Sequence, residues 1–444
     1  MINDLNQAEL SPVDDSNGTN ADMHSSLLLS SLLGQVLILV PFFLVGLLQQ
    51  KTIASLSASG LDKLLIESIP GCFVRYYWLL GAASLVALLR IYFDFKILPL
   101  YHSRAEAVFF STSMLFLLAW VALTRSLQFP ICGDDAYIDF RYVHNWVSGV
   151  GFDYNPGELV LGFTSHVHVL ILSALSLLFG ISQIDILSQA LNIILQFFVC
   201  SLVYLAFADI LRSRLFGLVG AAVYAFQPYN LNESIFGKET FLVQLLIILT
   251  IWLMHHGRYQ STAWLSCLMP FVRPEGVIWS FVILVSTCLR RSGSLAARLK
   301  IWYLPGFLAL VYLGTIFWIF KTVLPHGMIA KDLMIDRDPY WFVNIALKTI
   351  GSGGLLPLVD WISINDKVYV GTGIVASILF LILVRNPAFR VYKYFVLLFF
   401  WIVSLENPMP FSWYMSWFSF VNVMLFTVIF QLLSGKKTLM RLPG

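Results

Sequence analysis

Carboxylate and guanidinium groups gather in one polar stretch, residues 132–168, of a chain that is otherwise largely apolar. The stretch contains the adjacent pair Asp134 and Asp135, followed by Arg141 and Glu158. A carboxylate can remove the proton of an attacking hydroxyl group, and an arginine can hold two phosphate oxygens at once. These residue types favour group transfer on a substrate that carries a phosphate.

Aromatic and turn-forming residues run through the same stretch. Its aromatic side chains are Tyr137, Phe140, Tyr142, Trp146, Phe152 and Tyr154. The sequence Asn155-Pro156-Gly157 is typical of a tight turn and indicates a shaped segment. A solvated connector between two membrane helices is the alternative interpretation, but such a connector does not need aromatic residues. We therefore expect an active-site loop at a membrane surface.

Three further polar groups interrupt the apolar runs later in the chain. They are residues 232–240, 273–276 and 321–331, and each contains at least one lysine or arginine. Taken alone, such a cation most often only reaches from the membrane toward water. Charges beside a bilayer are costly unless they are paired or functional. Because all the groups fall on one predicted side of the membrane, we expect them to bind a lipid-linked phosphate, with a carboxylate as base.

The composition places the chain among polytopic membrane proteins. Of its 444 residues 58% are hydrophobic and only 12% are charged, whereas soluble domains carry about 25% charged residues. The mean hydropathy is +0.79. The net charge of +3 is small, so the sequence gives no indication that the chain binds nucleic acid.

Twelve apolar runs are separated by polar segments. They span residues 27–48, 76–93, 107–125, 184–207, 215–228, 240–254, 262–272, 274–290, 302–324, 368–384, 393–405 and 413–434. All the basic loops fall on one side of the membrane if residues 167–180 form an interfacial helix instead of a span. The pattern predicts an all-α polytopic membrane protein with about 12 transmembrane helices and both termini in the cytoplasm. The outer loops are then 126–183, 229–239, 325–367 and 406–412.

The sequence divides into four parts. Residues 1–25 are polar and predict a disordered cytoplasmic tail, and residues 26–106 form an extension with two apolar runs. The transmembrane catalytic module is expected over 107–435, and 436–444 form a short cytoplasmic tail.

Several other kinds of site are not indicated. The five cysteines lack metal-binding spacing, and the chain has neither a phosphate-binding P-loop motif nor a GxSxG nucleophile motif. His166 and His168 would share one face of an extended segment, but no third ligand is evident, so no zinc site is predicted. No residue is assigned to a metal, and a requirement for a divalent cation stays open.

The polar groups resemble a known family in their order. The sequence DDAYIDFRYVHNWVSGVGFDYNPGELVLGFTS, residues 134–165, resembles the signature loop of the bacterial GT-C glycosyltransferases related to mycobacterial arabinofuranosyltransferases. The motifs GKET at 237–240, RPEG at 273–276 and LPHGMIAK at 324–331 also match in order. The resemblance covers residues 107 to about 430. The two apolar runs before residue 107 are an addition to the family pattern, and no counterpart of the soluble C-terminal domain of the mycobacterial members follows the last run.

The resemblance implies a GT-C fold and a transferase of the bacterial inner membrane with its active site facing the periplasm. The donor would be a sugar on polyprenyl phosphate, such as arabinofuranose, and the acceptor a periplasmic glycan or lipid, with inversion at the sugar. Asp134 and Asp135 match the acidic pair that holds the catalytic base. The donor phosphate is expected at Arg141, Lys238, Arg273 and Lys331. Further substrate contacts are expected from Tyr137, Asn155, Glu158, Thr164, Glu239, Glu275 and His326.

Two other functions remain as alternatives. A flippase or secondary transporter for lipid-linked sugars is one, but transporters usually show internal repeats and charges near the membrane midplane. The sequence shows no repeat, and its charges cluster in predicted outer loops. A protein that binds a lipid-linked sugar without catalysis is the other.

Overall fold

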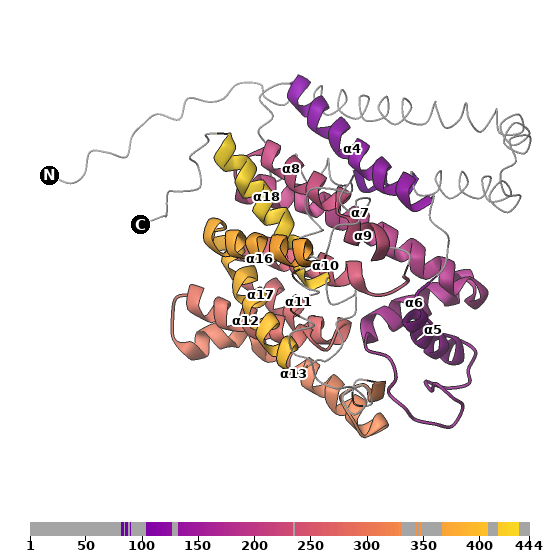
Figure 1. Cartoon of the computed structure of the whole chain (residues 1–444). Coiled ribbons are helices and arrows are strands. Elements are labelled where there is room, and N and C mark those ends of the chain that lie inside the picture. Colours follow the sequence, from indigo (N-terminus) through magenta and orange to yellow (C-terminus); the bar gives the residue numbers. More distant parts are fainter. Residues whose placement is uncertain are drawn as a thin grey trace, which may run out of the picture.

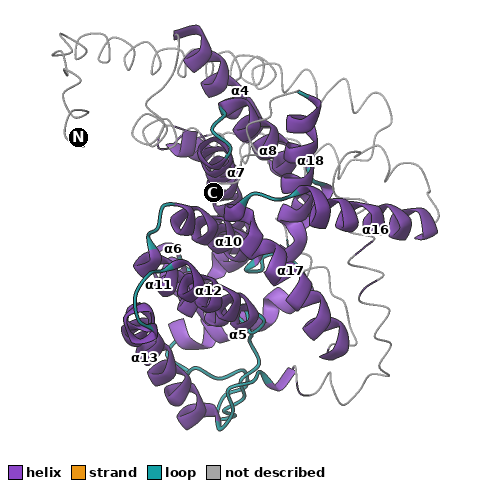
Figure 2. Cartoon of the chain, turned by 90° about the vertical axis from the view of Figure 1, so that its left-hand side faces the viewer, coloured by secondary structure: helices purple, strands orange, loops and turns teal. Residues whose placement is uncertain are grey.

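The structure is a computed structural model that describes residues 104–126, 132–233, 236–327, 366–406 and 416–434, and a few single positions outside these ranges. Within the described residues the regular elements are helices, with no strand (Figure 2). The predicted tails 1–25 and 436–444, most of the extension 26–106, and Lys331 lie outside the described residues.

The helices follow the apolar runs closely. In chain order they are α4 (Arg104–Ser126), α5 (Asp134–Val147), α6 (His166–Phe179), α7 (Ile184–Ile210), α8 (Arg214–Phe226), α9 (Pro228–Glu233), α10 (Thr240–His255), α11 (Tyr259–Val272), α12 (Gly276–Arg290), α13 (Leu295–Phe320), α16 (Asp366–Leu383), α17 (Pro387–Glu406) and α18 (Ser419–Leu433). A one-turn 3-10 helix, Ile181–Gln183, joins α6 to α7. Each predicted run from 107 onward therefore corresponds to a helix in the described part of the chain.

The helical and apolar character of the protein is confirmed. Four described segments are long and apolar enough to cross a membrane: Val108–Arg125, Ile181–Ile210, Leu295–Phe320 and Ser416–Leu433. Several other apolar helices are shorter than a straight span needs. The structure therefore supports an all-α membrane protein, while the number of twelve spans and the GT-C arrangement stay predictions.

Helix α7 lies within the bundle and contacts α4, α6, α8 and α10 (Figure 1). Every residue from Val199 to Ile210 is buried. The neighbouring α8 approaches it closely because it carries glycine at the contact. A Cβ atom on Gly217 would lie only 2.5 Å from the carbonyl oxygen of Tyr204. Small residues of this kind let two apolar helices pack backbone against backbone.

The polar group 273–276 lies at the tip of a helical hairpin formed by α11 and α12. The tip is the short segment from Arg273 to Glu275. A Cβ atom on Gly276 would lie 2.5 Å from the carbonyl oxygen of Met269, so the tight tip requires glycine there. The tip therefore holds Arg273 and Glu275 in fixed positions.

The polar stretch 132–168 is not a loop throughout, which corrects the sequence interpretation. Residues 134–147 form α5, whose buried residues include Ala136, Asp139, Phe140 and Val143. Their spacing of three and four positions is that of one helix face. The sequence interpretation weighed the polar composition of the stretch and overlooked this period.

The irregular part of the stretch, from Ser148 to Ser165, folds back on α5. The hydroxyl of Tyr142 donates a hydrogen bond to the carbonyl of Val160 and accepts one from the amide of Gly162 at 2.9 Å. The side-chain amide of Asn145 donates to the carbonyl of Asp153 at 2.8 Å. These contacts fix the segment that leads into α6, so it is shaped as predicted.

Helix α6 is short, with 14 residues, and begins after Ser165, whose hydroxyl accepts a hydrogen bond from the amide of His168. It packs on α5, α7 and α11, while Leu170, Leu177 and Leu178 on its other side are exposed. This length and the apolar exposed side are consistent with the predicted interfacial helix.

Candidate functional site

Three of the polar groups singled out in the sequence meet at the ends of α10, α11 and α12 that lie next to α5. The amide of Gly133 donates a hydrogen bond to the carbonyl of Phe236 at 3.0 Å. The ammonium of Lys238 donates to the carbonyl of Asp135 at 3.2 Å. The guanidinium of Arg273 contacts Glu239. The structure therefore joins the start of α5, the segment before α10 and the α11–α12 tip in one place.

At this junction lies a buried charge cluster, which we define as Asp139, His168, Lys238, Glu239 and Arg273. Their exposed fractions are 1%, 0%, 7%, 0% and 3%, respectively. They come from α5, the first turn of α6, the segment before α10 and the end of α11. Fully buried charged residues are rare unless they are paired. Burying these side chains costs free energy, and a functional role would explain why the protein keeps them together.

Arg273 contacts two carboxylates. Its Nη1 atom donates to Oε1 of Glu239 at 2.7 Å, and its Nε atom donates to Oε2 of Glu275 at 3.2 Å. The sequence analysis expected Arg273 to bind phosphate, and the structure buries it against two carboxylates. The planar guanidinium suits this double contact, which a lysine cannot reproduce.

Lys238 is held as a cation by its surroundings. Burial alone lowers the pKa of its ammonium, but the carboxylates of Asp139, Glu239 and Asp135 outweigh that effect, and the pKa is raised. Arg273 opposes the rise. Lys238 therefore stays positively charged at neutral pH, and it can attract an anion to the cluster.

The carboxylates of Asp139 and Glu239 and the ring of His168 are only partly satisfied. Oδ2 of Asp139 lies 3.1 Å from Nδ1 of His168. Oδ1 of Asp139, Nε2 of His168 and Oε2 of Glu239 are buried without a hydrogen-bond partner among the described residues. Buried polar atoms of this kind are costly, so the cluster has unused capacity for a ligand.

The predicted catalytic pair lies at the edge of the cluster. Asp134 is exposed, and its Oδ1 atom accepts a hydrogen bond from the amide of Asp135 at 2.9 Å. Asp135 is half-buried, its carbonyl accepts from Lys238, and its carboxylate is one of the groups that raise the pKa of that lysine. The structure thus places Asp135 closer to the buried charges than Asp134.

The structure does not bring Arg141 to the other predicted phosphate ligands. Arg141 is exposed, and its Nε atom donates to the carbonyl of Tyr154 at 3.2 Å. With Tyr137 and Asn155 it lines a separate open pocket of about 620 Å³. Glu158 is also exposed, and its Oε2 atom accepts from the side-chain amide of Asn155 at 3.0 Å. These predicted substrate residues form a second, outer group.

The fourth polar group is tied to the site through His326. The amide of His326 donates to the carbonyl of Leu161 at 2.8 Å, and the amide of Leu161 donates to Nδ1 of His326 at 3.1 Å. His326 therefore fixes the loop that precedes Thr164, which is itself half-buried. Lys331, the last residue of this motif, lies outside the described residues.

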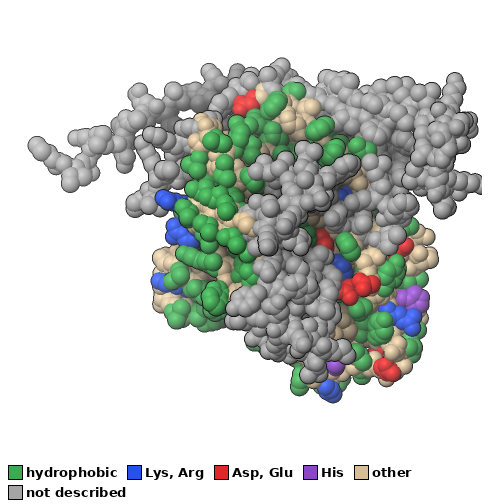
Figure 3. Space-filling model, viewed as in Figure 1, with side chains coloured by type: hydrophobic (Ala, Val, Ile, Leu, Met, Phe, Trp, Pro, Cys, Tyr) green, Lys and Arg blue, Asp and Glu red, His purple; other side chains and the backbone are tan. Residues whose placement is uncertain are grey.

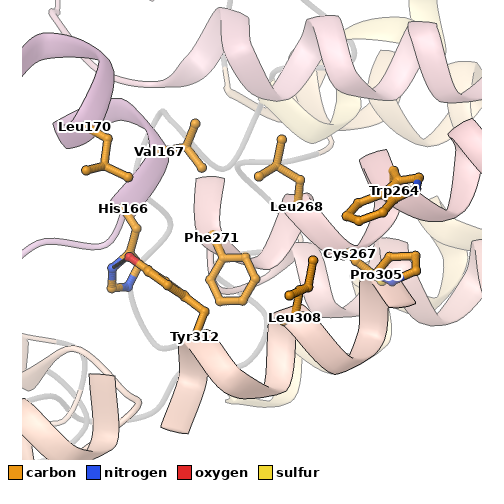
Figure 4. Close-up of a pocket in the computed structure, with 11 residues that line it drawn as sticks. His166, Val167, Leu170, Trp264, Cys267, Leu268, Phe271, Pro305, Leu308 and Tyr312 are labelled. Atoms are coloured by element: carbon orange, nitrogen blue, oxygen red, sulfur yellow. Dashed lines mark hydrogen bonds between the residues drawn. The ribbon is translucent and has the colours of Figure 1, made fainter. Parts of the chain in front are cut away.

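An apolar pocket of about 220 Å³ lies beside the cluster, between α6, α11 and α13 (Figure 4). Its lining residues are His166, Val167, Leu170, Trp264, Cys267, Leu268, Phe271, Pro305, Leu308, Ala309 and Tyr312. Two of them adjoin cluster residues in the chain, since His166 lies two positions before His168 and Phe271 lies two positions before Arg273. The charge of Asp139 also acts on His166, so the His166 end of the pocket lies near the cluster.

His166 forms the polar end of this pocket. Its Nδ1 atom lies 3.1 Å from the hydroxyl of Tyr312, and the two rings meet edge to face with an interplanar angle of 86° (Figure 4). Burial lowers the pKa of His166 to about 4, against the opposing charge of Asp139. His166 is therefore neutral at ordinary pH and leaves the pocket without charge.

The sequence analysis missed Asp139 and His168 as site residues. One signal for Asp139 was available, because it follows Asp135 by four positions and thus shares its face of α5. His168 had no such signal, because its neighbours Asp139 and Glu239 come from α5 and from the segment before α10, which are distant from it in the sequence. The sequence analysis treated His166 and His168 together. In the structure His166 lines the apolar pocket, whereas His168 belongs to the buried charge cluster.

The side chains around the junction combine three chemical capacities. Lys238 and Arg273 can attract an anion, and the nearby N-terminal ends of α6, α10 and α12 favour negative charge as well. Carboxylates at the rim can accept a proton, and the adjoining pocket can accept an apolar chain. Comparisons with protein-family models, with curated proteins and with solved structures find no match to this chain.

Proposed function

We propose that this protein is a membrane glycosyltransferase that moves a sugar from a polyprenyl-phosphate donor to a glycan or lipid acceptor. The observation that carries the proposal is an uncharged apolar pocket whose His166 end lies near a buried cluster with two cations. A donor of this class has the same two parts, an isoprenoid tail and an anionic phosphate. The GT-C fold, suggested by the ordered motifs, belongs to the same proposal.

The tail of the donor would enter the pocket between α6, α11 and α13. Two of its lining residues, Leu308 and Leu268, are partly exposed at the surface of the bundle, so a chain can reach the pocket from the lipid. Its phosphate would then meet Lys238 and Arg273. The five N–H groups of a guanidinium allow Arg273 to serve its two carboxylates and a phosphate oxygen together. Lys331 is proposed as a further phosphate contact.

The acceptor would approach from the side of α5. Its hydroxyl oxygen attacks the anomeric carbon of the sugar, and the bond from that carbon to the phosphate oxygen breaks on the opposite face, which inverts the configuration. The carboxylate of Asp134 or Asp135 takes the hydroxyl proton, and polyprenyl phosphate leaves with the bonding electrons. The cations stabilise the charge that grows on the leaving phosphate.

The exposed pocket around Arg141 suits the acceptor better than the donor. It is lined by Tyr137, Tyr154 and Asn155, and aromatic and amide side chains of this kind can stack on and hydrogen-bond to sugars. Arg141, which the family resemblance implied as a phosphate ligand, is in our proposal an acceptor residue.

The distribution of charge supports an orientation with this site outside the cell membrane. In Figure 3 acidic, basic and histidine side chains occur together on the side where α5 and α6 lie, whereas basic side chains dominate the opposite edge. The chain connections that face away from the cluster carry Arg212, Arg258 and Arg291. Because cytoplasmic loops are rich in arginine and lysine, we propose a bacterial inner-membrane protein with a periplasmic site.

A transfer assay tests the proposal directly. Membranes that contain the protein are supplied with a panel of synthetic polyprenyl-phosphate sugars, arabinofuranose included, and an envelope glycan acceptor. We expect a product whose mass increases by one sugar residue, together with released polyprenyl phosphate. The control is Lys238→Gln at equal expression, which should lose the product. Movement of intact donor across vesicles without a covalent product would instead identify a transporter.

A further inference from the structure

The buried charge cluster contains three side chains that can bind a metal ion. Asp139, His168 and Glu239 each offer one ligand atom, and these atoms lie within 4.8 Å of one another. All three residues are buried, with exposed fractions of 1%, 0% and 0%. They come from three separate elements, so the fold itself brings them together.

The same three residues carry the unsatisfied atoms of the cluster. Oδ1 of Asp139, Nε2 of His168 and Oε2 of Glu239 have no hydrogen-bond partner among the described residues. Glu239 uses its other oxygen for Arg273, and Asp139 uses its other oxygen for His168. Each side chain thus has one buried polar atom without a partner among the described residues, and such atoms are costly unless a ligand satisfies them.

The balance of charge around the cluster also favours the binding of a cation. Among the described residues, the carboxylates of Asp135, Asp139, Glu239 and Glu275 interact with the cations Lys238 and Arg273. Within this set the carboxylates outnumber the cations by two, and the two carboxylates of Asp139 and Glu239 are fully buried. Uncompensated buried charge is expensive, and one divalent cation would neutralise it.

We propose that Asp139, His168 and Glu239 form a binding site for a divalent metal ion. Two carboxylate oxygens and one imidazole nitrogen suit a first-row ion such as Mn²⁺ or Zn²⁺, because imidazole is a poor ligand for Ca²⁺. Ligand atoms about 2.1 Å from such an ion are roughly 3–4 Å apart. The ligand atoms of the three residues lie within 4.8 Å of one another, close to that range. Three protein ligands leave coordination positions open for an oxygen atom of another molecule.

His166 is not part of this site, although it is the nearest other histidine in the chain. It contacts Tyr312 at the apolar pocket instead. The assignment of His168 is therefore specific, and it does not depend on the proposed transferase activity. A metal ion here would lie next to Lys238 and Arg273, where any bound phosphate would also meet it.

Metal binding to the purified protein tests the site without an activity assay. The chelator-treated full-length protein in detergent is titrated with Mn²⁺, and free Mn²⁺ is followed by electron paramagnetic resonance. We expect one tight site per chain, from which Zn²⁺ displaces Mn²⁺ and Ca²⁺ does not. Asp139→Asn, His168→Gln and Glu239→Gln should each weaken binding at least about tenfold.

Matched substitutions control for general effects of the changes. His144→Gln and Glu158→Gln alter exposed residues on α5 and in the loop after it, and both should bind Mn²⁺ like the unaltered protein. Gel filtration of every variant shows whether it is folded. Absence of a tight site in the unaltered protein would overturn the proposal, whatever the variants do. Equal binding by the unaltered protein and a folded His168→Gln variant would overturn it as well.

Discussion

The guanidinium of Arg273 lies 2.7 Å from the carboxylate of Glu239, and both side chains are almost completely buried. The pair joins the α11–α12 tip to the segment before α10, which is 34 positions earlier in the chain. Glu275 completes the arrangement from the other side of the guanidinium. The position of the principal cation of the site therefore depends on two carboxylates that differ in burial.

Loss of Glu239 should destabilise the protein more than loss of Glu275. Removing one partner of a buried ion pair leaves the other charge uncompensated and costs about 3–5 kcal/mol. Glu275 is 10% exposed, so water can replace part of its contact. The measurement is thermal unfolding of Glu239→Gln and Glu275→Gln in detergent with a chelator present. Equal melting temperatures for the two variants would show that the Arg273–Glu239 pair stabilises the protein no more than the Arg273–Glu275 contact.

Arg273→Lys should weaken donor binding although it keeps the positive charge. A lysine ammonium cannot contact Glu239, Glu275 and a phosphate oxygen in the same geometry. We expect a loss of about 1.5–3 kcal/mol, the contribution of a hydrogen bond to a charged group, which is more than tenfold in affinity. The measurement is binding of the polyprenyl-phosphate donor.

Arg141→Lys is the matched control for this experiment. Arg141 is exposed and lines the outer pocket, so its replacement should leave donor affinity unchanged. A similar loss of donor affinity in Arg141→Lys and Arg273→Lys would contradict the separation of donor and acceptor regions.

Turnover should depend on the acidic pair, whereas donor binding should not. Replacement of the base by its amide removes proton transfer, which contributes about 10²–10⁴-fold to the rate. Asp134→Asn and Asp135→Asn are compared at equal expression for turnover and for donor affinity. The variant with the larger loss of turnover at unchanged affinity identifies the base. If both variants turn over normally, neither aspartate is the base.

A bulkier side chain in the apolar pocket should discriminate between donors by tail length. Leu308→Trp would fill part of the cavity of about 220 Å³ between α6, α11 and α13. Each methylene group kept out of an apolar environment costs about 0.8 kcal/mol, so a long-chain donor should lose about tenfold in affinity. A short-chain donor should be unaffected. Leu310→Trp, on the exposed surface of the same helix, is the control and should alter neither donor.

Tyr142→Phe should loosen the segment between α5 and α6. The hydroxyl of Tyr142 bonds to two backbone groups, at Val160 and Gly162. Leaving such buried groups unpaired costs about 1–3 kcal/mol, which thermal unfolding would reveal as a lower melting temperature. Tyr154→Phe removes a hydroxyl from an exposed ring and should have little effect. A melting temperature for Tyr142→Phe equal to that of Tyr154→Phe would mean that the segment is held by other contacts.

The helices could be predicted from the sequence because burial in a membrane bundle needs long apolar runs. The run 184–207 appears as α7 and the run 240–254 as α10, with ends within a few residues. The interruption at Arg273 could be predicted for the same reason, since a charged residue and a proline end an apolar helix. Helix α5 was missed because it is amphipathic and polar, so its period was less obvious than its composition.

The site itself was predicted only in part. Lys238, Glu239 and Arg273 were selected because charged residues are rare in such a chain, and the structure brings them together. Arg141 was grouped with them because it belongs to the stretch that resembles the family signature, yet it is exposed and lines a separate pocket. His168 could not be selected, because its surroundings depend on how the fold brings α6 next to α5 and to the segment before α10.

The hydrogen bonds between Leu161 and His326 join residues that are 165 positions apart. At about 5–20 residues per second of synthesis, the earlier segment leaves the ribosome roughly 8–33 s before its partner exists. During that interval the segment after α5 lacks its attachment to the later half of the chain. A protease in the compartment that receives this segment therefore has a limited period of access, which ends when the ribosome has delivered the second half of the molecule to the membrane.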